Sequence, residues 1–409
     1  MRRILCICLC ICILLLCGCA ESTPENTSSC TEPETTEQTA PLETRCEDTQ
    51  PAETEAEQPL PTEEPEPEPT HPPDPVDEVL NSMTIVEKVG QLFLARCPDI
   101  NAVDDISAYH LGGYILFGRD FDSQTPDSFR EKIESYQAAA AIPLLIAVDE
   151  EGGTVTRVSS HAAFRSSKFR SPRALYDENG MQLVLETEQE KCTLLASLGI
   201  NVNMAPVCDI TTDSSAFMYS RSLGQDAQTT ASYIEQVVTL MEQNHIGSVL
   251  KHFPGYGNNA DTHVGIAIDR RSVQDLQNND LVPFEAGMHS NCGAVLVSHT
   301  IIADIDDQYP ASLSPAVHRM IREDMGYEGV ILTDDLAMQA ITKAYGTGEA
   351  AVLAVQAGND LLCSSHYQEQ YKAVLDAVQD GRISEAQIDE AALRVIRWKM
   401  DLDLPFEFH

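Results

Sequence analysis

The chain has 409 residues, 13 cysteines and a formal net charge of −38 at pH 7. This acidity argues against nucleic acid as a partner, because binding to phosphates needs a basic surface. The charge is unevenly distributed, so the sequence divides into a leader at 1–19, a linker at 20–75 and a body at 76–409.

The leader has the pattern of a bacterial lipoprotein signal peptide. Arg2 and Arg3 precede an apolar run that is too short for a comfortable membrane span. The run ends in Leu-x-Gly-Cys, which resembles a lipobox with cleavage before Cys19 and a lipid on its sulfur. We therefore expect an extracytoplasmic protein, held by that lipid on the outer face of the cell membrane. An uncleaved N-terminal anchor and plain secretion are the alternatives.

The linker is expected to be disordered. It contains 16 acidic residues against one base, Arg45, and 12 of the chain's 22 prolines. It contains no phenylalanine, tryptophan, tyrosine, isoleucine or valine. Such a segment buries too little apolar surface to offset its ordering entropy, and proline and like charges extend it. It suits a tether between the membrane and the body.

The body alternates short apolar runs with helical patterns. We predict strands at 92–96, 114–118, 143–148, 202–207, 247–251, 293–297, 329–333 and 360–364. Helical spacing recurs between them, for example at 181–198, 228–244, 314–325, 347–357, 367–379 and 384–401. This alternation predicts a parallel sheet, and eight units favour one α/β domain with a (β/α)8 TIM-like barrel over an open doubly wound sheet. The five body cysteines show no C-x-x-C spacing and are expected to be small core residues.

Polar residues lie at or just past the ends of five of the predicted strands. They are Asp149, Asp209, Lys251 with His252, His299 and Asp334. The carboxyl ends of parallel barrel strands share one rim, where active sites are built. A single polar residue after a strand is usually a helix cap, but five in register predict an active site.

Asp334 is the candidate nucleophile. It follows the apolar strand at 329–333, so it can be fixed in the barrel mouth, while the adjacent Asp335 is expected to cap the next helix. Retaining glycosidases need one carboxylate to attack the anomeric carbon and a second group to protonate the leaving oxygen. That both acids only cap the helix is the alternative.

The stretch "KHFPGYGNNADTH", residues 251–263, offers that second group. Asp261 can accept a hydrogen bond from one ring nitrogen of His263 and so make the other nitrogen more basic. Contacts to sugar hydroxyls are expected from Lys251, His252, Asp149, Arg157 and Arg221.

Two other interpretations of this stretch involve a cofactor or a metal. Its glycines outline a G-x-G-x-x-A dinucleotide turn, but the asparagines and Gly265 that follow discourage the helix that such a turn must open. His252, Asp261 and His263 could hold zinc, although their spacing matches no familiar ligand pattern. We therefore expect neither a cofactor nor a metal.

Together these stretches resemble glycoside hydrolase family 3, and within it the single-domain β-N-acetylglucosaminidases (β-N-acetylhexosaminidases) of bacteria. The matching pieces, in family order, are "GGYILFGRD", "VDEEGGTVTR", "GINVNMAPVCDI", "RSLG", "KHFPGYG", "DTH", "PASLSP" and "GVILTDDLAM". They cover about residues 80–364. Tyr256 stands where many relatives have histidine, and the segment between Gly257 and Asp261 is one residue shorter than in the best-known members.

The resemblance implies a (β/α)8-like barrel and retaining hydrolysis of terminal β-linked N-acetylglucosamine. It places the nucleophile at Asp334 and the acid/base at His263, which Asp261 orients. It also places the sugar contacts at Asp149, Arg157, Arg221, Lys251 and His252, with Met338 near the N-acetyl group.

The expected function is exo-hydrolysis of cell-wall fragments (muropeptides) or chitin-type oligosaccharides, with a carbohydrate substrate and the membrane as partners. Because a histidine replaces the usual anionic acid/base, an anionic acceptor meets less repulsion, so phosphorolysis is an alternative. Another family 3 β-glycosidase activity is a further alternative. The last is a non-catalytic wall-binding lipoprotein, against which the presence of Asp334, Asp261 and His263 argues.

Overall fold

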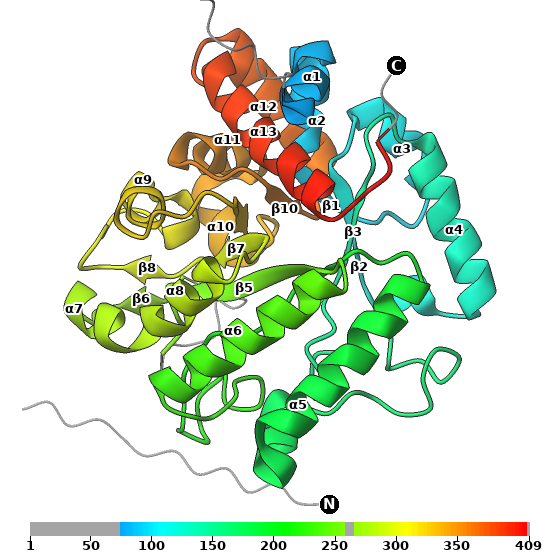
Figure 1. The fold of residues 1–409 in the computed structure, drawn as a ribbon. Helices are drawn as coiled ribbons and strands as arrows, with labels where there is room; N and C mark the ends of the chain where they lie inside the picture. The colour runs from blue at the N-terminus through cyan, green and yellow to red at the C-terminus, as the bar shows by residue number, and fades with distance from the viewer. Residues whose placement is uncertain (1–73, 258–265, 407–409) are drawn as a thin grey trace, which may run out of the picture. The chain divides into compact units, whose positions relative to one another are not determined.

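The computed structural model describes residues 74–257 and 266–406. Within these ranges, parallel strands follow one another round a single sheet (Figure 1). They are β1 Phe93–Arg96, β2 Gly113–Leu116, β3 Leu145–Val148, β4 Val202–Asn203, β5 Gly247–Phe253, β7 Ala294–Val297, β9 Val330–Thr333 and β10 Leu362–Ser364. β1 pairs with both β2 and β10, and a parallel bridge joins Leu332 to Leu361, so the sheet nearly closes. The predicted (β/α)8 barrel is confirmed, and the open doubly wound sheet is wrong.

All eight predicted strands are present, because each is a short apolar run that the barrel buries on both faces. The prediction at 202–207 is too long. Pro206 has no N–H for a ladder bond, so β4 ends at Asn203 and only an isolated bridge from Val207 to Lys251 follows. The sequence did not predict a small parallel sheet of β6 Ile268–Asp269 and β8 Ile301–Ile302, in the loops after β5 and β7.

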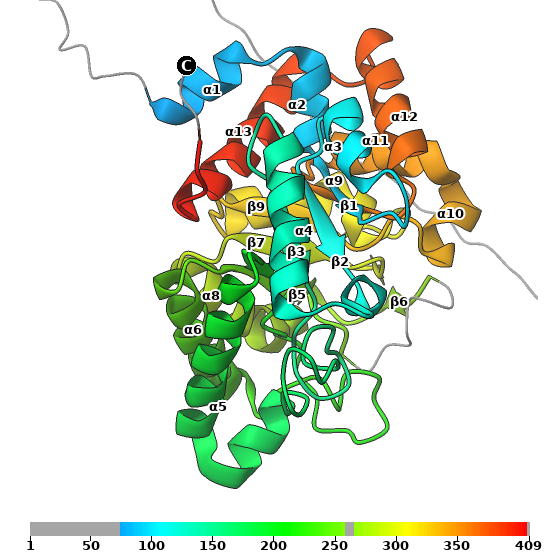
Figure 2. The same ribbon diagram turned by 90° about the vertical axis from the view of Figure 1, so that its right-hand side faces the viewer.

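Helices surround the barrel (Figure 2). They are α1 Pro75–Ser82, α2 Ile85–Gln91, α3 Ala102–Tyr109, α4 Pro126–Ala139, α5 Pro172–Ser197, α6 Ala227–Gln243, α7 Val273–Asp275, α8 Leu281–His289, α9 Pro315–Arg319, α10 Gln339–Tyr345, α11 Thr347–Ala357, α12 Tyr367–Gln379 and α13 Glu385–Asp401. Short 3-10 and π segments are η1 Gly118–Phe121, η2 Leu276–Asp280, η3 Ala311–Leu313 and η4 Met320–Asp324. The predicted helices are confirmed, although the one at 181–198 is only the second part of α5, which is kinked at Asn179 and Gly180.

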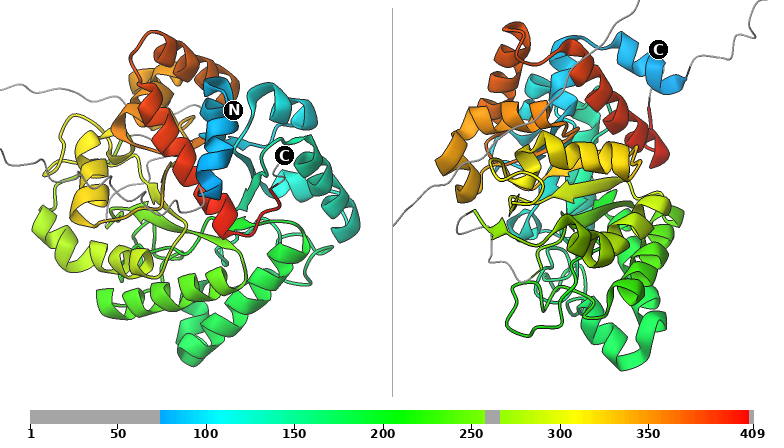
Figure 3. Two further views of the ribbon diagram at one scale, coloured as in Figure 1. Left: turned by 45° about the horizontal axis from the view of Figure 1, so that its top comes forward. Right: turned by 90° about the vertical axis from the view of Figure 1, so that its left-hand side faces the viewer.

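Helix α13 closes the N-terminal end of the barrel and packs beside α1 and α2 (Figure 3). Its Trp398 belongs to the same buried cluster as the inward-facing strand residues. A Cβ on Gly293, just before β7, would lie 1.9 Å from the indole Nε1 of Trp398, so only glycine fits there. The indole therefore fills the floor of the barrel.

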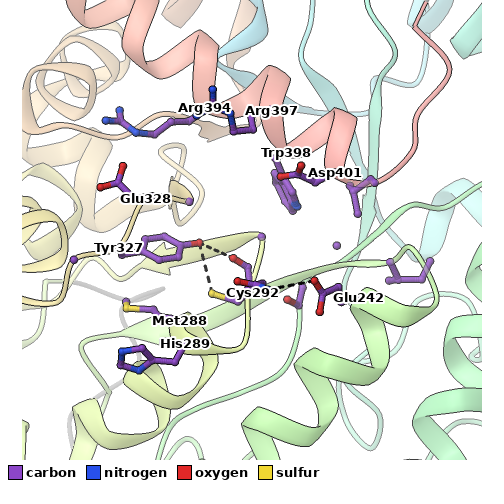
Figure 4. Close-up of a pocket in the computed structure, with 18 of the residues that line it drawn as sticks. Glu242, Met288, His289, Cys292, Tyr327, Glu328, Arg394, Arg397, Trp398 and Asp401 are labelled. Carbon is purple, nitrogen blue, oxygen red and sulfur yellow. Dashed lines mark hydrogen bonds between the residues drawn. The ribbon is translucent and has the colours of Figure 1, made fainter. Parts of the chain in front are cut away.

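A cavity of about 630 Å³ lies at this same N-terminal end (Figure 4). Gly247, Gly293 and Gly329, at the starts of β5, β7 and β9, form part of its wall, together with Trp398. The polar residues predicted to form the active site follow the opposite ends of the strands. This large cavity is therefore not the candidate active site.

The five body cysteines, Cys97, Cys192, Cys208, Cys292 and Cys363, are buried and unpaired, as predicted. Across 74–257 and 266–406, no helix is long and apolar enough to cross a bilayer. The predicted leader, its Cys19 and the predicted linker up to residue 73 lie outside the described residues, as do Asp261 and His263.

Candidate active site

The rim at the carboxyl ends of the strands gathers the polar residues that the sequence singled out. Asp149 directly follows β3, Lys251 and His252 lie near the end of β5, and Asp334 directly follows β9. Because the barrel is parallel throughout, these strands all end on the same side. The predicted grouping of the polar residues on one rim is therefore confirmed by the topology.

Glu151 is the centre of the charge network on this rim. One of its oxygens lies 2.7 Å from the Lys251 ammonium, and Arg221 holds both oxygens in a fork, with distances of 2.6 and 2.9 Å. Burial alone would raise the pKa of Glu151, but Lys251 and then Arg221 hold that pKa well below its ordinary value. Glu151 is therefore a fixed carboxylate and not a proton donor.

Asp149 links this network to the barrel mouth. Its Oδ1 accepts a hydrogen bond of 2.7 Å from Lys251, and its Oδ2 lies 3.6 Å from an Arg157 guanidinium nitrogen. Burial lowers the pKa of Lys251, but Asp149 and Glu151 outweigh it and keep that pKa above its ordinary value. The result is an ammonium and a carboxylate side by side, a pair that can both donate to and accept from sugar hydroxyls.

His252 is held in one tautomer. Its Nδ1 lies 2.8 Å from Asp209 Oδ2, and its Nε2 lies 3.2 Å from a guanidinium nitrogen of Arg221. Since arginine only donates, Nε2 must accept and Nδ1 must carry the proton that it donates to Asp209. With both ring nitrogens engaged in this way, His252 is not available as the general acid.

Asp209 also fixes the start of the following loop. Its Oδ1 accepts a 2.7 Å bond from the backbone N–H of Tyr256, and its Oδ2 accepts a 3.1 Å bond from that of His252. The sequence marked Asp209 only as a polar residue after a strand and did not include it in the site. Its role is to position His252 and the chain as far as Tyr256.

Asp334 is the first residue after β9, and its backbone still bonds to the neighbouring strand β7. Its N–H donates to Val297 O at 3.2 Å, and its Oδ1 accepts a 2.8 Å bond from the N–H of Asp335. The side chain of Asp335 serves a different partner, because its oxygens accept bonds from the Ser365 N–H at 3.1 Å and the Ser365 hydroxyl at 2.5 Å. The two acids therefore have different partners.

The predicted helix cap at Asp335 is wrong. The next helix, α10, starts only at Gln339, and its N-cap, Met338, makes no side-chain capping bond. Asp335 instead ties the loop after β9 to the chain after β10. Met338, the predicted contact to the N-acetyl group, is half-buried four residues beyond Asp334.

His299 also supports the loop after β9. Its Nδ1 lies 2.7 Å from the Ser312 hydroxyl, and its Nε2 lies 3.1 Å from the backbone oxygen of Asp335. The ring is completely buried. His299 therefore positions the loop that carries Asp334.

Glu150 anchors the loop that carries Arg157. Its Oε2 accepts backbone bonds of 2.8 and 2.7 Å from Arg157 and Val158, and its Oε1 accepts one from the Ser159 hydroxyl. Of the three consecutive acids, Asp149 and Glu151 therefore pair with cationic side chains, whereas Glu150 holds the backbone of the loop that follows. The sequence showed all three acids but assigned a role only to Asp149.

Arg271 clamps the base of the loop that carries Asp261 and His263. It forms ion pairs with Asp269 at 2.6 Å and Asp280 at 2.7 Å and donates to the Gly255 carbonyl at 3.0 Å. Gly257 has φ +54°, and a Cβ there would lie 2.6 Å from the Arg271 guanidinium carbon. The glycines of the G-x-G-x-x-A pattern are therefore needed for close packing, which argues against a dinucleotide turn.

Within 74–257 and 266–406 there is no cluster of three or more histidine, cysteine or acidic side chains that could hold a metal. The zinc interpretation of the sequence depends on Asp261 and His263, which lie outside these ranges. The charged side chains of the network around Glu151 are paired with one another, which suits the binding of polar, uncharged groups.

Comparisons with known proteins show the family to which the chain is similar. The model of the glycosyl hydrolase family 3 N-terminal domain matches residues 84–398. The β-hexosaminidase of Thiobacillus denitrificans is 32% identical over 270 residues, which cover 65% of this chain and 74% of the relative. The β-hexosaminidase LpqI of Mycobacterium tuberculosis is 31% identical over 326 residues, with 76% and 82% coverage.

Among solved structures, a glycoside hydrolase family 3 β-N-acetylglucosaminidase from Paenibacillus sp. FPU-7 aligns with a TM-score of 0.73 and 32% identity. The alignment covers 80% of this chain and 65% of that one, so this chain spans just under two thirds of that protein. The match of the family model over most of the body shows that the chain belongs to glycosyl hydrolase family 3 and is a glycoside hydrolase.

Proposed function

We propose that the protein is a retaining exo-β-N-acetylglucosaminidase that acts on cell-wall fragments or chitin-type oligosaccharides. The observation that carries the proposal is the position of Asp334 at the end of β9, on the same rim as the Asp149–Lys251–Glu151 network. The names of the relatives, β-hexosaminidase and β-N-acetylglucosaminidase, support the choice of sugar.

In this mechanism the Asp334 carboxylate attacks the anomeric carbon as the glycosidic C–O bond breaks. His263, oriented by Asp261, gives its proton to the leaving oxygen, which departs as an alcohol. His263 then takes a proton from water, and the resulting hydroxide displaces Asp334, so the anomeric configuration is retained overall.

The sugar would be held through its hydroxyls. Lys251 and Arg157 donate hydrogen bonds and Asp149 accepts them, while Glu151 fixes the Lys251 and Arg221 side chains. Asp209 and Arg221 hold both ring nitrogens of His252, so its ring would contact the sugar by packing, and Met338 would lie against the N-acetyl group. Because most of these groups are already paired with one another, the pocket is preorganised before the sugar arrives.

The cellular location of the enzyme is also part of the proposal. The leader with Cys19 and the acidic linker support an enzyme that is anchored by a lipid outside the cytoplasmic membrane and extends into the wall. A carbohydrate is then the substrate and the membrane a passive support.

The direct test is hydrolysis of an aryl β-N-acetylglucosaminide by the body. We expect turnover by the wild type, a loss of at least a thousandfold in Asp334→Ala and little change in Asp307→Ala, an exposed acid in the segment after β8. Absence of turnover in the wild type would favour a wall-binding protein. The same assay with and without phosphate shows whether the product is the free sugar or the sugar phosphate.

A further inference from the structure

The loop after β4 carries Arg221, one of the two cations that hold Glu151. In this loop, residues 209–226, all of which the structure describes, the chain forms turns and no helix or strand. The turns are closed by local bonds, such as Arg221 N–H to Met218 O at 3.0 Å. Local bonds fix the shape of each turn but not the place of the Arg221 loop on the barrel. The position of Arg221 therefore depends on side chains that reach the loop from other elements.

Arg173, at the start of helix α5, is such a side chain. Its Nε donates to the Tyr219 carbonyl at 3.0 Å, and one terminal nitrogen donates to the Thr211 carbonyl at 2.8 Å. The same nitrogen donates to the Ser222 hydroxyl at 3.1 Å, and the guanidinium lies over the Tyr219 ring at 3.9 Å. Thr211 lies near the beginning of the Arg221 loop and Ser222 near its end. One planar guanidinium therefore holds both sides of the loop.

Gly224 makes room for this guanidinium. It has φ +79°, and a Cβ there would lie 2.1 Å from the Arg173 guanidinium carbon. The chain therefore passes directly against Arg173 on its way to α6, at a position where a side chain would not fit. This close packing gives a physical reason for the glycine in "RSLG", residues 221–224.

The position of Arg173 is unfavourable for its own helix. It is the second residue of α5, where the positive end of the helix dipole disfavours a cation. Its three hydrogen-bond partners are neutral oxygens, 38, 46 and 49 positions away in the sequence, so these bonds do not neutralise its charge. The gain from this cation therefore lies in the Arg221 loop and not in α5.

The contact with Arg173 reaches the proposed sugar pocket through Arg221. Arg221 directly precedes Ser222, and its fork holds the Glu151 oxygens at 2.6 and 2.9 Å. One of its nitrogens also lies 3.2 Å from His252 Nε2. Such a fork needs a fixed backbone, because a displacement of about 1 Å away from Glu151 would lengthen both bonds beyond the normal hydrogen-bond range.

We propose that Arg173 is a positioning residue for the sugar pocket, which holds Arg221 against Glu151. The proposal rests on the proposed function, because the pocket that it supports is the one that would bind the sugar. Arg173 acts through Arg221 and not on the reacting atoms. Its loss should therefore weaken sugar binding and leave the chemical step at Asp334 nearly unchanged.

The first test is steady-state hydrolysis of an aryl β-N-acetylglucosaminide by the wild type, Arg173→Met and Arg173→Lys. Methionine removes the donors, whereas lysine keeps the charge but presents a single nitrogen that cannot span the loop. We expect KM to rise roughly tenfold in both variants, while kcat changes less than about threefold. Arg170→Met, which removes an exposed arginine three residues earlier, is the control and should match the wild type.

A double-mutant cycle with Arg221→Lys tests whether the effect passes through Arg221. In that background Arg173→Met should raise KM by less than about a further twofold, because the fork that Arg173 positions is already lost. Additive effects of the two changes, or a wild-type KM in Arg173→Met and Arg173→Lys, would overturn the positioning role.

Hydrogen exchange of the protein without sugar gives a second readout that needs no turnover. Peptides from the Arg221 loop should exchange roughly tenfold faster in the Arg173 variants than in the wild type, while peptides from β9 should exchange as before. Unchanged exchange of the loop would also overturn the proposal. If the wild type hydrolyses no β-N-acetylglucosaminide, the proposed function fails, and the exchange data still decide whether Arg173 holds the loop.

Discussion

Glu151 and Lys251 are in contact at the base of the barrel mouth, with 2.7 Å between Oε1 and Nζ, and both side chains are almost completely buried. Arg221 completes the neutralisation of Glu151 from the other side. The proposed sugar-binding face of the rim therefore rests on a carboxylate that is shielded from solvent and holds Lys251 and Arg221 in place.

Replacing Glu151 with glutamine should destabilise the protein by about 3 kcal/mol, because it leaves two buried cations without their shared partner. We expect this loss in urea unfolding at pH 7, with Glu134→Gln, an exposed change of the same type on α4, close to wild type. Equal stability of Glu151→Gln and the wild type would contradict the central role of the carboxylate.

The same carboxylate predicts a pH dependence. The pKa of Glu151 is lower in the folded chain than its ordinary value of 4.5, so its ion pairs contribute fully above that value and weaken as the pH falls below it. The wild type should therefore lose stability in acid more steeply than Glu151→Gln. Parallel acid unfolding curves for the two proteins would refute this assignment.

Asp209→Asn should impair sugar binding through His252. Both oxygens of Asp209 accept bonds, from Tyr256 N–H on one side and from the ring and N–H of His252 on the other. An amide must turn its NH₂ group toward one of these donors, which costs about 1–3 kcal/mol. We expect kcat/KM to fall roughly tenfold, mainly through KM, and Asp307→Asn to be neutral; an unchanged KM would exclude this positioning role.

Lys399 predicts a pH effect of the same direction in a more alkaline range. It is completely buried on α13, where its ammonium donates to Gln91 Oε1 at 2.6 Å, and burial lowers its pKa to about 7. Between pH 7 and its ordinary value of 10.5, the unfolded chain holds a proton that the folded chain has lost, so stability rises with pH.

Lys399→Met should therefore stabilise the protein at pH 7 by on the order of 2 kcal/mol and remove this rise. Urea unfolding at pH 7, 8 and 9 measures both effects, with the exposed Lys372→Met as the control. A stability of Lys399→Met that still rises with pH as in the wild type would show that another group titrates.

Much of this architecture could be predicted from the sequence, because each barrel strand is a local apolar run and Asp149, Lys251 with His252, and Asp334 lie at the ends of such runs. The hydrogen-bond and ion-pair partners of those residues could not be predicted from the sequence. Asp209 is 43 positions from His252, and Glu151 is 70 from Arg221, so only the closed barrel brings them together. Glu151 lies two residues after Asp149. The run of three acids after a strand was the signal in the sequence that could have identified Glu151 as a site residue. The acid/base role of His263 and its orientation by Asp261 stay predictions.

The assignment of Asp334 as the nucleophile is tested most directly by trapping the glycosyl-enzyme. The body is incubated with a 5-fluoro β-N-acetylglucosaminyl fluoride, which slows the second step, and its peptides are analysed by mass spectrometry. We predict that the peptide containing Asp334 gains one fluorosugar and that the site maps to Asp334. An adduct on Glu151, Asp335 or any other residue, or inactivation without a covalent sugar, would contradict the account.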